Sequence, residues 1–266
     1  MKLSIITINL NNAEGLRKTI ESVINQTFTD FEYIVIDGAS TDKSVDILKQ
    51  YANKITYWIS EPDTGIYNAM NKGLQLAKGE YVHFLNSGDF LPDNNVYEKL
   101  DEMSEMTADV IYGNRIHIYS EEKQVLSKGL AKSDLSFDDA YRGLIPHSST
   151  LTKRNLFDKY GLFNESFKIV SDTEFFLKAI GLGKCSIEYV DLTISCFDMN
   201  GISKNAQTSA LCQLEFEKMK KEVLSQELVE AYEFTQKYGY KMKRINKRKW
   251  SAFLFRILNR LAYIIN

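Results

Sequence analysis

Three aspartates stand where a predicted strand gives way to a turn, and their carboxylates could do chemistry together. They are Asp37, Asp63 and Asp89. Carboxylates gathered in this way can accept hydrogen bonds from a base or a ribose, and they can hold a divalent cation on a diphosphate, because Mg²⁺ and Mn²⁺ prefer oxygen ligands. Turn formation is the alternative, since Asp-Gly and Gly-Asp sequences satisfy local backbone donors.

The segments that must position these acids alternate in character. Unbroken apolar runs predict strands covered on both faces, and these runs are residues 3–8, 31–36, 55–59 and 81–85. Apolar residues at helical spacing predict helices between them, with Asn11 or Asn12 as the cap of the first and Gly79 at the C′ position of the third. Strands that alternate with helices favour a parallel sheet, in which ligands bind at the carboxyl ends of the strands. The three acids are therefore expected at one edge of the sheet.

The second half of the chain follows a different rhythm. From about residue 109 the pattern becomes strand-rich, at 110–119 and 185–197, around a helix that begins near Asp172. One α/β domain is expected to extend to about residue 205. Two helices are expected after it, at roughly residues 206–237 and 242–265.

The composition excludes several classes of protein. A chain of 266 residues with 44% hydrophobic and 26% charged residues is globular. Three cysteines without a CxxC pair argue against a disulfide framework and a zinc knuckle, and they fit a reducing cytoplasm. The N-terminal MKLSIITI lacks the cleavage region of a signal peptide, and no apolar stretch reaches the roughly 18 residues that a membrane span needs.

The C-terminal tail differs in charge from the rest of the chain. Residues 241–266 contain eight basic residues and no acid, which leaves 25 basic against 35 acidic residues elsewhere. On a helix, the apolar residues of this tail form one stripe, and a basic amphipathic helix suits an anionic membrane surface. Packing on its own domain or on a second subunit, as in a homodimer, is the alternative. Because the main body is acidic, a nucleic-acid partner is disfavoured.

Other nucleotide and metal motifs are missing or incomplete. No GxGxxG follows the first strand, and GLGKCS at residues 181–186 lacks two defining residues of a P-loop. The histidines His83, His117 and His147 have no metal-ligand spacing. His83 alternates into a strand and is expected in the core, whereas His147 follows Pro146 in a polar loop and is a candidate for contact with an acceptor or a diphosphate.

Three ordered segments together resemble family 2 glycosyltransferases, in the bacterial polysaccharide branch that includes colanic-acid-type enzymes. They read SIITINLNNAEGLRKTIESVINQTFTDFEYIVIDGASTDKS, EPDTGIYNAMNKGLQLAKGEYVHFLNSGD and HSSTLTKRNLFDKYGLFNESFKIVSDTEFFLKA. The resemblance implies the GT-A fold, a nucleotide-diphosphate-sugar donor, Mg²⁺ or Mn²⁺, and inversion at the anomeric carbon. It also implies that residues 1–105 bind the donor, that residues 106–205 bind the acceptor, and that residues 206–266 form a helical extension.

The resemblance assigns roles to single residues. Asp89 is expected to hold the metal and Asp172 to act as the general base. The residues expected at the donor are Ile8, Asn9, Asp37, Ser40, Asp63, Lys72, Asn86, Ser87 and Gly88.

The chain departs from the family pattern in four places. Ile8 and Leu10 replace a proline and a tyrosine, and Gly38 replaces the second acid of DDGS, which bears on whether the donor is a UDP-sugar. Met70 replaces an arginine near the diphosphate, for which Lys72 is the expected substitute. The usual acidic run is reduced to residues 86–89, with Asp89 as its remaining acid.

The resulting hypothesis is a hexosyltransferase of cell-envelope polysaccharide biosynthesis that works in the cytoplasm or on the cytoplasmic face of the inner membrane. Its acceptor is a hydroxyl of a glycan or of a lipid-linked glycan, from which Asp172 removes the proton. The alternative for Asp172 is a helix cap. The alternatives for the protein are a nucleotidyltransferase that forms the activated sugar and a non-catalytic module that binds a sugar nucleotide or a glycan.

Overall fold

The computed structural model describes residues 1–130, 135–199 and 206–245. The chain divides into two compact units, residues 1–209 and 210–266. The strands all belong to the first unit, and they are β1 (Leu3–Asn9), β2 (Phe31–Asp37), β3 (Tyr57–Ser60), β4 (Tyr81–Phe84), β5 (Val110–Ile118), β6 (Gln124–Ser127), β7 (Thr150–Lys153) and β8 (Ile187–Asp198).

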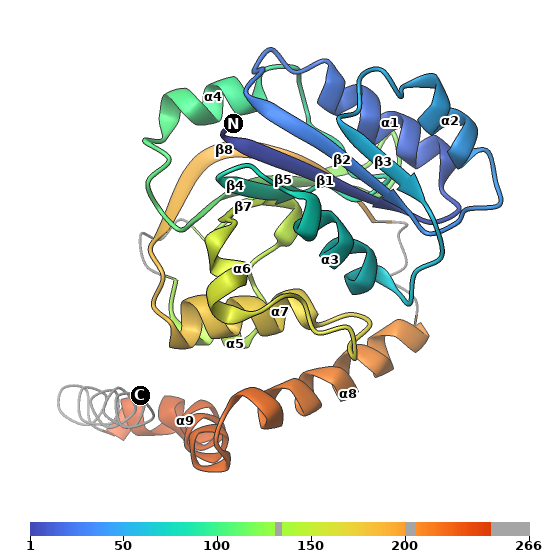
Figure 1. Cartoon of the computed structure of the whole chain (residues 1–266). Helices are drawn as coiled ribbons and strands as arrows, with labels where there is room; N and C mark the ends of the chain where they lie inside the picture. Colours follow the sequence, from blue (N-terminus) through green and yellow to red (C-terminus); the bar gives the residue numbers. More distant parts are fainter. Residues whose placement is uncertain (131–134, 200–205, 246–266) are drawn as a thin grey trace. The chain divides into compact units, whose positions relative to one another are not determined.

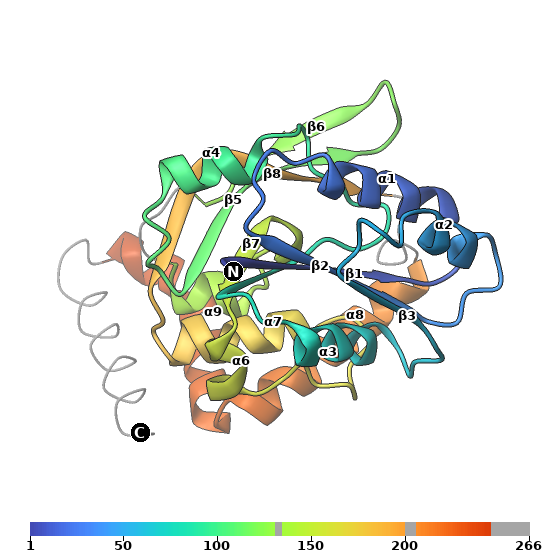
Figure 2. The same ribbon diagram turned by 45° about the horizontal axis from the view of Figure 1, so that its top comes forward.

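The helices of the first unit connect these strands. They are α1 (Ala13–Ile24), α2 (Ser44–Gln50), α3 (Ile66–Leu76), α4 (Val96–Met103), α5 (Phe137–Tyr141), α6 (Asn155–Tyr160) and α7 (Ser171–Phe176), with the short turns η1 (His147–Ser149) and η2 (Leu177–Leu182). In Figures 1 and 2, α1, α2 and α4 cover one face of the sheet, and α3, α6 and α7 cover the other.

One eight-stranded sheet has the order β3-β2-β1-β4-β7-β5-β6, and β8 pairs with β5. The ladders from β3 to β4 are parallel, as the alternating pattern predicts. Strand β7 is antiparallel to β4 and β5, and β6 is antiparallel to β5, with which it forms the hairpin seen at the top of Figure 2. The expected central sheet is confirmed, but the short strands β6 and β7 were not foreseen.

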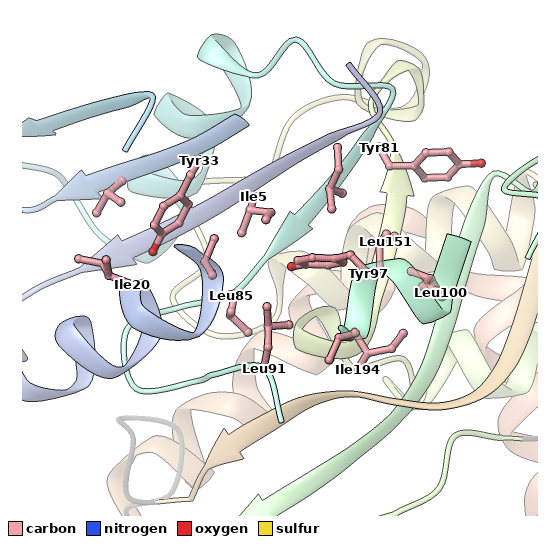
Figure 3. Close-up of a cluster of buried hydrophobic side chains, with 14 of the residues drawn as sticks. Ile5, Ile20, Tyr33, Tyr81, Leu85, Leu91, Tyr97, Leu100, Leu151 and Ile194 are labelled. Atoms are coloured by element: carbon pink, nitrogen blue, oxygen red, sulfur yellow. The ribbon is translucent and has the colours of Figure 1, made fainter. Parts of the chain in front are cut away.

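The apolar runs form the core. Every residue of β1 is buried, because β1 lies between β2 and β4 and is covered on both faces. On α1, the predicted apolar face is Leu16, Ile20, Val23 and Ile24, of which the first three are fully buried and Ile24 is partly buried. The side chain of Asn12 caps the helix by accepting a hydrogen bond from the Gly15 N–H. Figure 3 shows side chains of this core, among them Ile20 of α1, Tyr33 of β2 and Tyr97 of α4.

The predicted role of Gly79 as a C′ residue is wrong. Helix α3 already ends at Leu76, and Gly79 does not have a positive φ. A Cβ atom on Gly79 would instead lie 2.5 Å from the backbone nitrogen of Ser4. Glycine is required here because the chain entering β4 passes directly against the backbone of β1.

The helices of the C-terminal region are α8 (Ala206–Val223) and α9 (Gln226–Ile245). The predicted helix over 206–237 is therefore wrong in extent, since the chain breaks at residues 224–225 and Ser225 accepts a hydrogen bond from the Leu228 N–H. Most of the predicted helix over 242–265 lies outside the described residues. In the described part of the chain, no helix has the length and apolarity that crossing a membrane requires.

Substituting Gly79 with alanine tests the close approach of β1 and β4. We expect Gly79→Ala to lower the free energy of unfolding by about 1–3 kcal/mol, because the added methyl group meets backbone and must push two strands apart. Exposed Glu80 offers a matched control, and Glu80→Ala is expected to change stability by less than about 0.5 kcal/mol. Urea unfolding of the two variants measures both values, and equal stabilities would contradict the packing argument.

Candidate active site

Asp37 organises the carboxyl ends of β1, β2 and β3. It is fully buried, and its carboxylate accepts hydrogen bonds from the Asn9 side-chain amide at 2.7 Å, from the Ser60 hydroxyl at 2.6 Å, and from both the N–H and the hydroxyl of Ser40 at 2.9 and 2.6 Å. These contacts engage both of its oxygens. The carboxylate therefore acts on the surrounding loops, which it holds in place.

Ser40 in turn links two of the loops at this edge. Its hydroxyl oxygen accepts a hydrogen bond from the Asn11 N–H at 2.8 Å, and the Asn11 side chain accepts one from the Thr41 N–H at 2.8 Å. The turns after β1 and β2 are thus joined through side chains. The predicted donor residues Asn9, Asp37 and Ser40 form a single network.

Asp63 comes to the same edge from the loop after β3. A Cβ atom on Gly38 would lie 2.4 Å from Asp63 Oδ2 and 3.4 Å from the side chain of Leu10. The absence of a side chain at Gly38 therefore makes room for the carboxylate of Asp63. Leu10 is 52% exposed beside it, whereas Ile8 is buried in the strand.

Lys72 contacts the loop after β3, whereas Met70 lies in the core. Lys72 Nζ lies 2.7 Å from Glu61 Oε1 and donates a hydrogen bond to the Pro62 carbonyl at 2.9 Å, so it supports the loop that carries Asp63. Met70 is buried in the core.

Helix α1 holds the turn that follows β4. The Asn12 amide donates to the Ser87 carbonyl at 3.1 Å, and the Thr19 hydroxyl donates to the Asp89 carbonyl at 2.6 Å while it accepts from the Gly88 N–H at 3.0 Å. Gly88 has a φ of 103°, a value that favours glycine. These contacts direct the carboxylate of Asp89 inward.

Asp89 is 5% exposed and lies beside a second acid at the end of β8. Its Oδ1 accepts a hydrogen bond from the Asp198 N–H at 3.1 Å. Burial and, to a smaller extent, the negative charge of Asp198 raise the pKa of Asp89 to about 7, although the Asp198 N–H, His147 and Arg115 oppose the shift. The Asp198 carboxylate lies 3.6 Å from the position of a Cβ atom on Gly88.

Arg115 of β5 brings a positive charge to this part of the site. Its guanidinium lies over the ring of Phe197 at 5.3 Å, and its Nε is buried and has no hydrogen-bond partner among the described residues. Its positive charge acts on both Asp89 and His147, where it opposes the rise in their pKa values.

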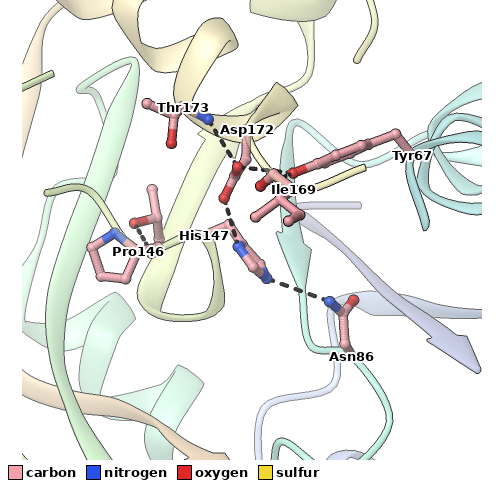
Figure 4. A network of polar contacts seen from close by, with 8 residues as sticks. Tyr67, Asn86, Pro146, His147, Ile169, Asp172 and Thr173 are labelled. Carbon is pink, nitrogen blue, oxygen red and sulfur yellow. Dashed lines mark hydrogen bonds and ion pairs between the residues drawn. The ribbon is translucent and has the colours of Figure 1, made fainter. Parts of the chain in front are cut away.

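His147 and Asp172 form a hydrogen-bonded pair, shown in Figure 4. His147 Nδ1 lies 3.0 Å from Asp172 Oδ2, and the other ring nitrogen, Nε2, lies 3.4 Å from the Asn86 amide nitrogen. Asp172 Oδ1 accepts hydrogen bonds from the Tyr67 hydroxyl at 3.0 Å and from the Thr173 N–H at 2.9 Å. The pair thus links α7 to Asn86, which follows strand β4 and precedes Asp89 by three residues.

The pKa values of the pair move apart. Burial by itself raises the pKa of Asp172, but the hydrogen bond and charge of His147, with the bonds from Thr173 and Tyr67, outweigh burial and lower it. Burial by itself lowers the pKa of His147, but the hydrogen bond and charge of Asp172 outweigh it and raise it. An ionised Asp172 therefore stabilises a proton on His147.

The predicted roles of His83 and Asp172 can be compared with their positions in the structure. His83 is a core residue as expected, because it is fully buried and its two ring nitrogens bond to the Tyr97 hydroxyl and the Ser148 carbonyl, both at 2.8 Å. Asp172 is not a helix cap, since the N-cap of α7 is Val170. Arg115 and Asp198 were not predicted as site residues, because they stand in strands whose sequence pattern gives no sign of a site.

Comparison with known proteins identifies the class first. The chain superimposes on Staphylococcus aureus TarS in complex with UDP-GlcNAc with a TM-score of 0.64, at 20% identity over 80% of this chain and 65% of that chain. It also superimposes on the mannosyltransferase PcManGT from Pyrobaculum calidifontis in complex with GDP-Man and Mn²⁺ with a TM-score of 0.57, at 15% identity over 87% of this chain and 64% of that one. This chain spans 43% of a longer TarS structure. The fold is that of the GT-A glycosyltransferases.

The family follows from sequence. The profile of glycosyl transferase family 2 matches residues 4–167. An uncharacterized glycosyltransferase of Mycobacterium tuberculosis is 31% identical over 216 residues, 79% of either chain. A PGL/p-HBAD biosynthesis glycosyltransferase of Mycobacterium bovis is 22% identical over 96% of this chain and 93% of its own. The protein belongs to glycosyltransferase family 2.

The raised pKa of Asp89 predicts a pH dependence of stability in the absence of divalent cations. Between about pH 4 and pH 7 the native state holds a proton that the unfolded state releases, so this carboxyl destabilises the fold increasingly as the pH rises. Asp89→Asn is therefore expected to be more stable than the natural protein by on the order of 2 kcal/mol at pH 8 and nearly equal at pH 4.

Urea unfolding at the two pH values measures this difference. Glu102→Gln, at an exposed position, is the control and should give the same small change at both pH values. A difference between Asp89→Asn and the natural protein that does not grow with pH would contradict the assignment.

Proposed function

We propose that this glycosyltransferase moves a sugar from a nucleotide-diphosphate donor to a hydroxyl of a glycan or lipid-linked acceptor, with inversion, in bacterial surface polysaccharide biosynthesis. The observation that carries the proposal is the position of the His147–Asp172 pair, which contacts Asn86 in the same turn that carries Asp89. A proton-accepting pair and a carboxylate suited to a cation on a diphosphate thus occupy one site. Sugar transfer to a hydroxyl needs a proton acceptor for that hydroxyl close to the groups that hold the diphosphate.

The nucleoside is proposed to bind where Asp63 and Leu10 are brought together over Gly38. The Asp63 carboxylate can accept hydrogen bonds from a base or ribose, and exposed Leu10 offers an apolar surface beside it. Asp37 then acts indirectly, because its bonds to Asn9 and Ser40 keep the loops of this pocket in place. A UDP-sugar is the first donor to test, since TarS is a structural neighbour in complex with UDP-GlcNAc.

The residues present fit a divalent cation. Asp89 and Asp198 bring two acidic side chains together, and the pKa of Asp89 is raised first by burial and then by the negative charge of Asp198, which a cation would offset. Among the described residues there is no cluster of three or more His, Cys, Asp and Glu side chains for a metal. Mg²⁺ and Mn²⁺ do not need one, because they often take one or two carboxylates and complete their shell with phosphate and water. We assign Asp89 and Asp198 to this role, in which the ion neutralises charge on the leaving diphosphate.

Arg115 is proposed to bind the diphosphate. Its charge acts on Asp89 and His147, and its buried Nε has no hydrogen-bond partner in the described part of the chain. Lys72, the expected substitute for the missing family arginine, is already bonded to Glu61 and Pro62. A planar guanidinium can bind phosphate oxygens with two donors at once.

Release of nucleoside diphosphate from a panel of nucleotide sugars tests the function. With Mn²⁺ we expect the natural protein to release UDP from a UDP-sugar, and we expect EDTA to stop the release. Asp172→Asn should bind the donor in a thermal-shift assay and lose about 10²–10⁴-fold in turnover. Because the substitution preserves the size of the side chain, an unchanged melting temperature serves as the folding control.

The same assay separates the alternatives. Release of pyrophosphate from a sugar phosphate and a nucleoside triphosphate would favour a nucleotidyltransferase. Tight binding of a nucleotide sugar with no turnover would favour a binding module. Either result would contradict the proposed transfer.

The basic tail is proposed to attach the enzyme to an anionic membrane surface. Residues 246–266, which carry most of the apolar stripe, lie outside the described residues, so the support is the pattern of basic and apolar residues in the sequence. Flotation with vesicles containing phosphatidylglycerol should carry the full chain but not a chain that ends at residue 240. Neutral phosphatidylcholine vesicles are the control, and equal flotation of both chains would contradict the proposal.

A further inference from the structure

The proton of the acceptor hydroxyl has two potential destinations, a carboxylate oxygen of Asp172 and the Nε2 atom of His147. The difference matters because a general base works best when its pKa lies near the working pH. Both side chains are partly accessible, with exposed fractions of 24% for His147 and 17% for Asp172. Exposure alone does not separate them, but their hydrogen bonds do.

The oxygens of Asp172 are largely engaged. Oδ2 faces His147 Nδ1, and Oδ1 accepts from the Thr173 N–H and shares the proton of Tyr67, whose hydroxyl also bonds to the Ile169 carbonyl at 2.6 Å. Each of these bonds favours the ionised carboxylate, and together they lower its pKa. Asp172 is thereby a good hydrogen-bond acceptor but a poor proton acceptor.

The ring of His147 has the opposite character. An ionised carboxylate can only accept, so the hydrogen bond to Asp172 places a proton on Nδ1 and leaves a lone pair on Nε2 of the neutral ring. Nε2 faces the Asn86 amide at 3.4 Å, a long contact that an incoming hydroxyl can replace. As Figure 4 shows, this atom points away from Asp172 and toward the end of β4.

The surrounding structure fixes the ring in this orientation. His147 follows Pro146, whose carbonyl accepts hydrogen bonds from the Ser149 N–H at 3.2 Å and the Thr150 hydroxyl at 2.7 Å. The charged groups that act on the ring are Asp172, Asp89 and Arg115, and the charge of His147 in turn contributes to the lowered pKa of buried His83. Asp172 and Asp89 favour a proton on His147, whereas Arg115 opposes it.

We propose that His147 Nε2 is the general base of the transfer and that Asp172 is a positioning residue that acts through it. The inference rests on the proposed function and deepens it. The hydroxyl oxygen forms a bond to the anomeric carbon, and the bond from that carbon to the diphosphate oxygen breaks with its electron pair. The hydroxyl proton moves to Nε2, and His147 later releases it to solvent.

The ring tautomer tests the proposal without any substrate. The chain has three histidines, so ¹⁵N spectra of the full protein without added metal can be assigned with a His147→Gln variant. We expect neutral His147 to carry its proton on Nδ1 and to titrate above its ordinary value. Asp172→Asn should lower that pKa by about one unit or more. A proton on Nε2 of the neutral ring would overturn the proposal.

Kinetics test the role of the base in turnover. With UDP-N-acetylglucosamine and Mn²⁺ as the probe and water as acceptor, His147→Ala should lose about 10²–10⁴-fold in kcat, while the KM for the donor changes little. Added imidazole should restore part of the loss, because it can occupy the vacated space and accept the proton. Imidazole should not rescue Asp172→Asn, which retains the ring.

The outcomes are distinguishable from failure of the proposed function. A His147→Ala variant within tenfold of the natural protein, or a loss that imidazole leaves unchanged at an unaltered melting temperature, would return the proton to Asp172. Absence of turnover by the natural protein with every nucleotide sugar would contradict the proposed function. In that case the ring tautomer still decides whether Nε2 can accept a proton.

Discussion

Four phenylalanine rings connect strand β4 to helix α7, and the geometry of the site depends on them. Phe84 of β4 packs edge-on against Phe163 at 5.4 Å, and Phe163 packs against Phe175 of α7 at 5.8 Å. Phe157 stacks on Phe175 at 4.3 Å and also contacts Phe84. Aromatic pairs contribute about 0.5–1.5 kcal/mol each beyond their buried area, and their preferred angles resist sliding. This packing sets the distance between Asp172 and the end of β4.

Bringing the charged groups of the site together costs folding free energy, but the same charges can bind a charged ligand. Asp89 is buried beside Asp198, and the rise in its pKa to about 7 shows that the fold disfavours its ionised form. Arg115 and His147 bring positive charge to the same place and offset part of this cost. A diphosphate with its cation adds charge of both signs to such a site. The donor is therefore expected to stabilise the arrangement that binds it.

Much of the structure of residues 1–105 could be predicted from sequence, because the signals in this part of the chain are local. The run Leu3 to Ile8 is buried on both faces, and turn-forming residues follow the strands, with two asparagines after β1, Gly38 after β2, and Asn86 and Gly88 after β4. The place of Asp63 over Gly38 could not be predicted, since it depends on how two loops approach each other. Arg115 and Asp198 were missed for a related reason, because only the pairing of β5 with β8 brings them to the site.

The proton-accepting pair illustrates the limit of sequence reasoning. His147 and Asp172 stand 25 positions apart and belong to different elements, so no periodicity links them. Each was a candidate on its own, but the direction of proton transfer follows only from the hydrogen bonds of both. The parallel strands supply Asp37 and Asp89, whereas His147 precedes the antiparallel strand β7 and Asp172 begins α7. Because the network around Asp37 and the His147–Asp172 pair come from different halves of the chain, changes in the second half can alter the pair while the network around Asp37 stays intact.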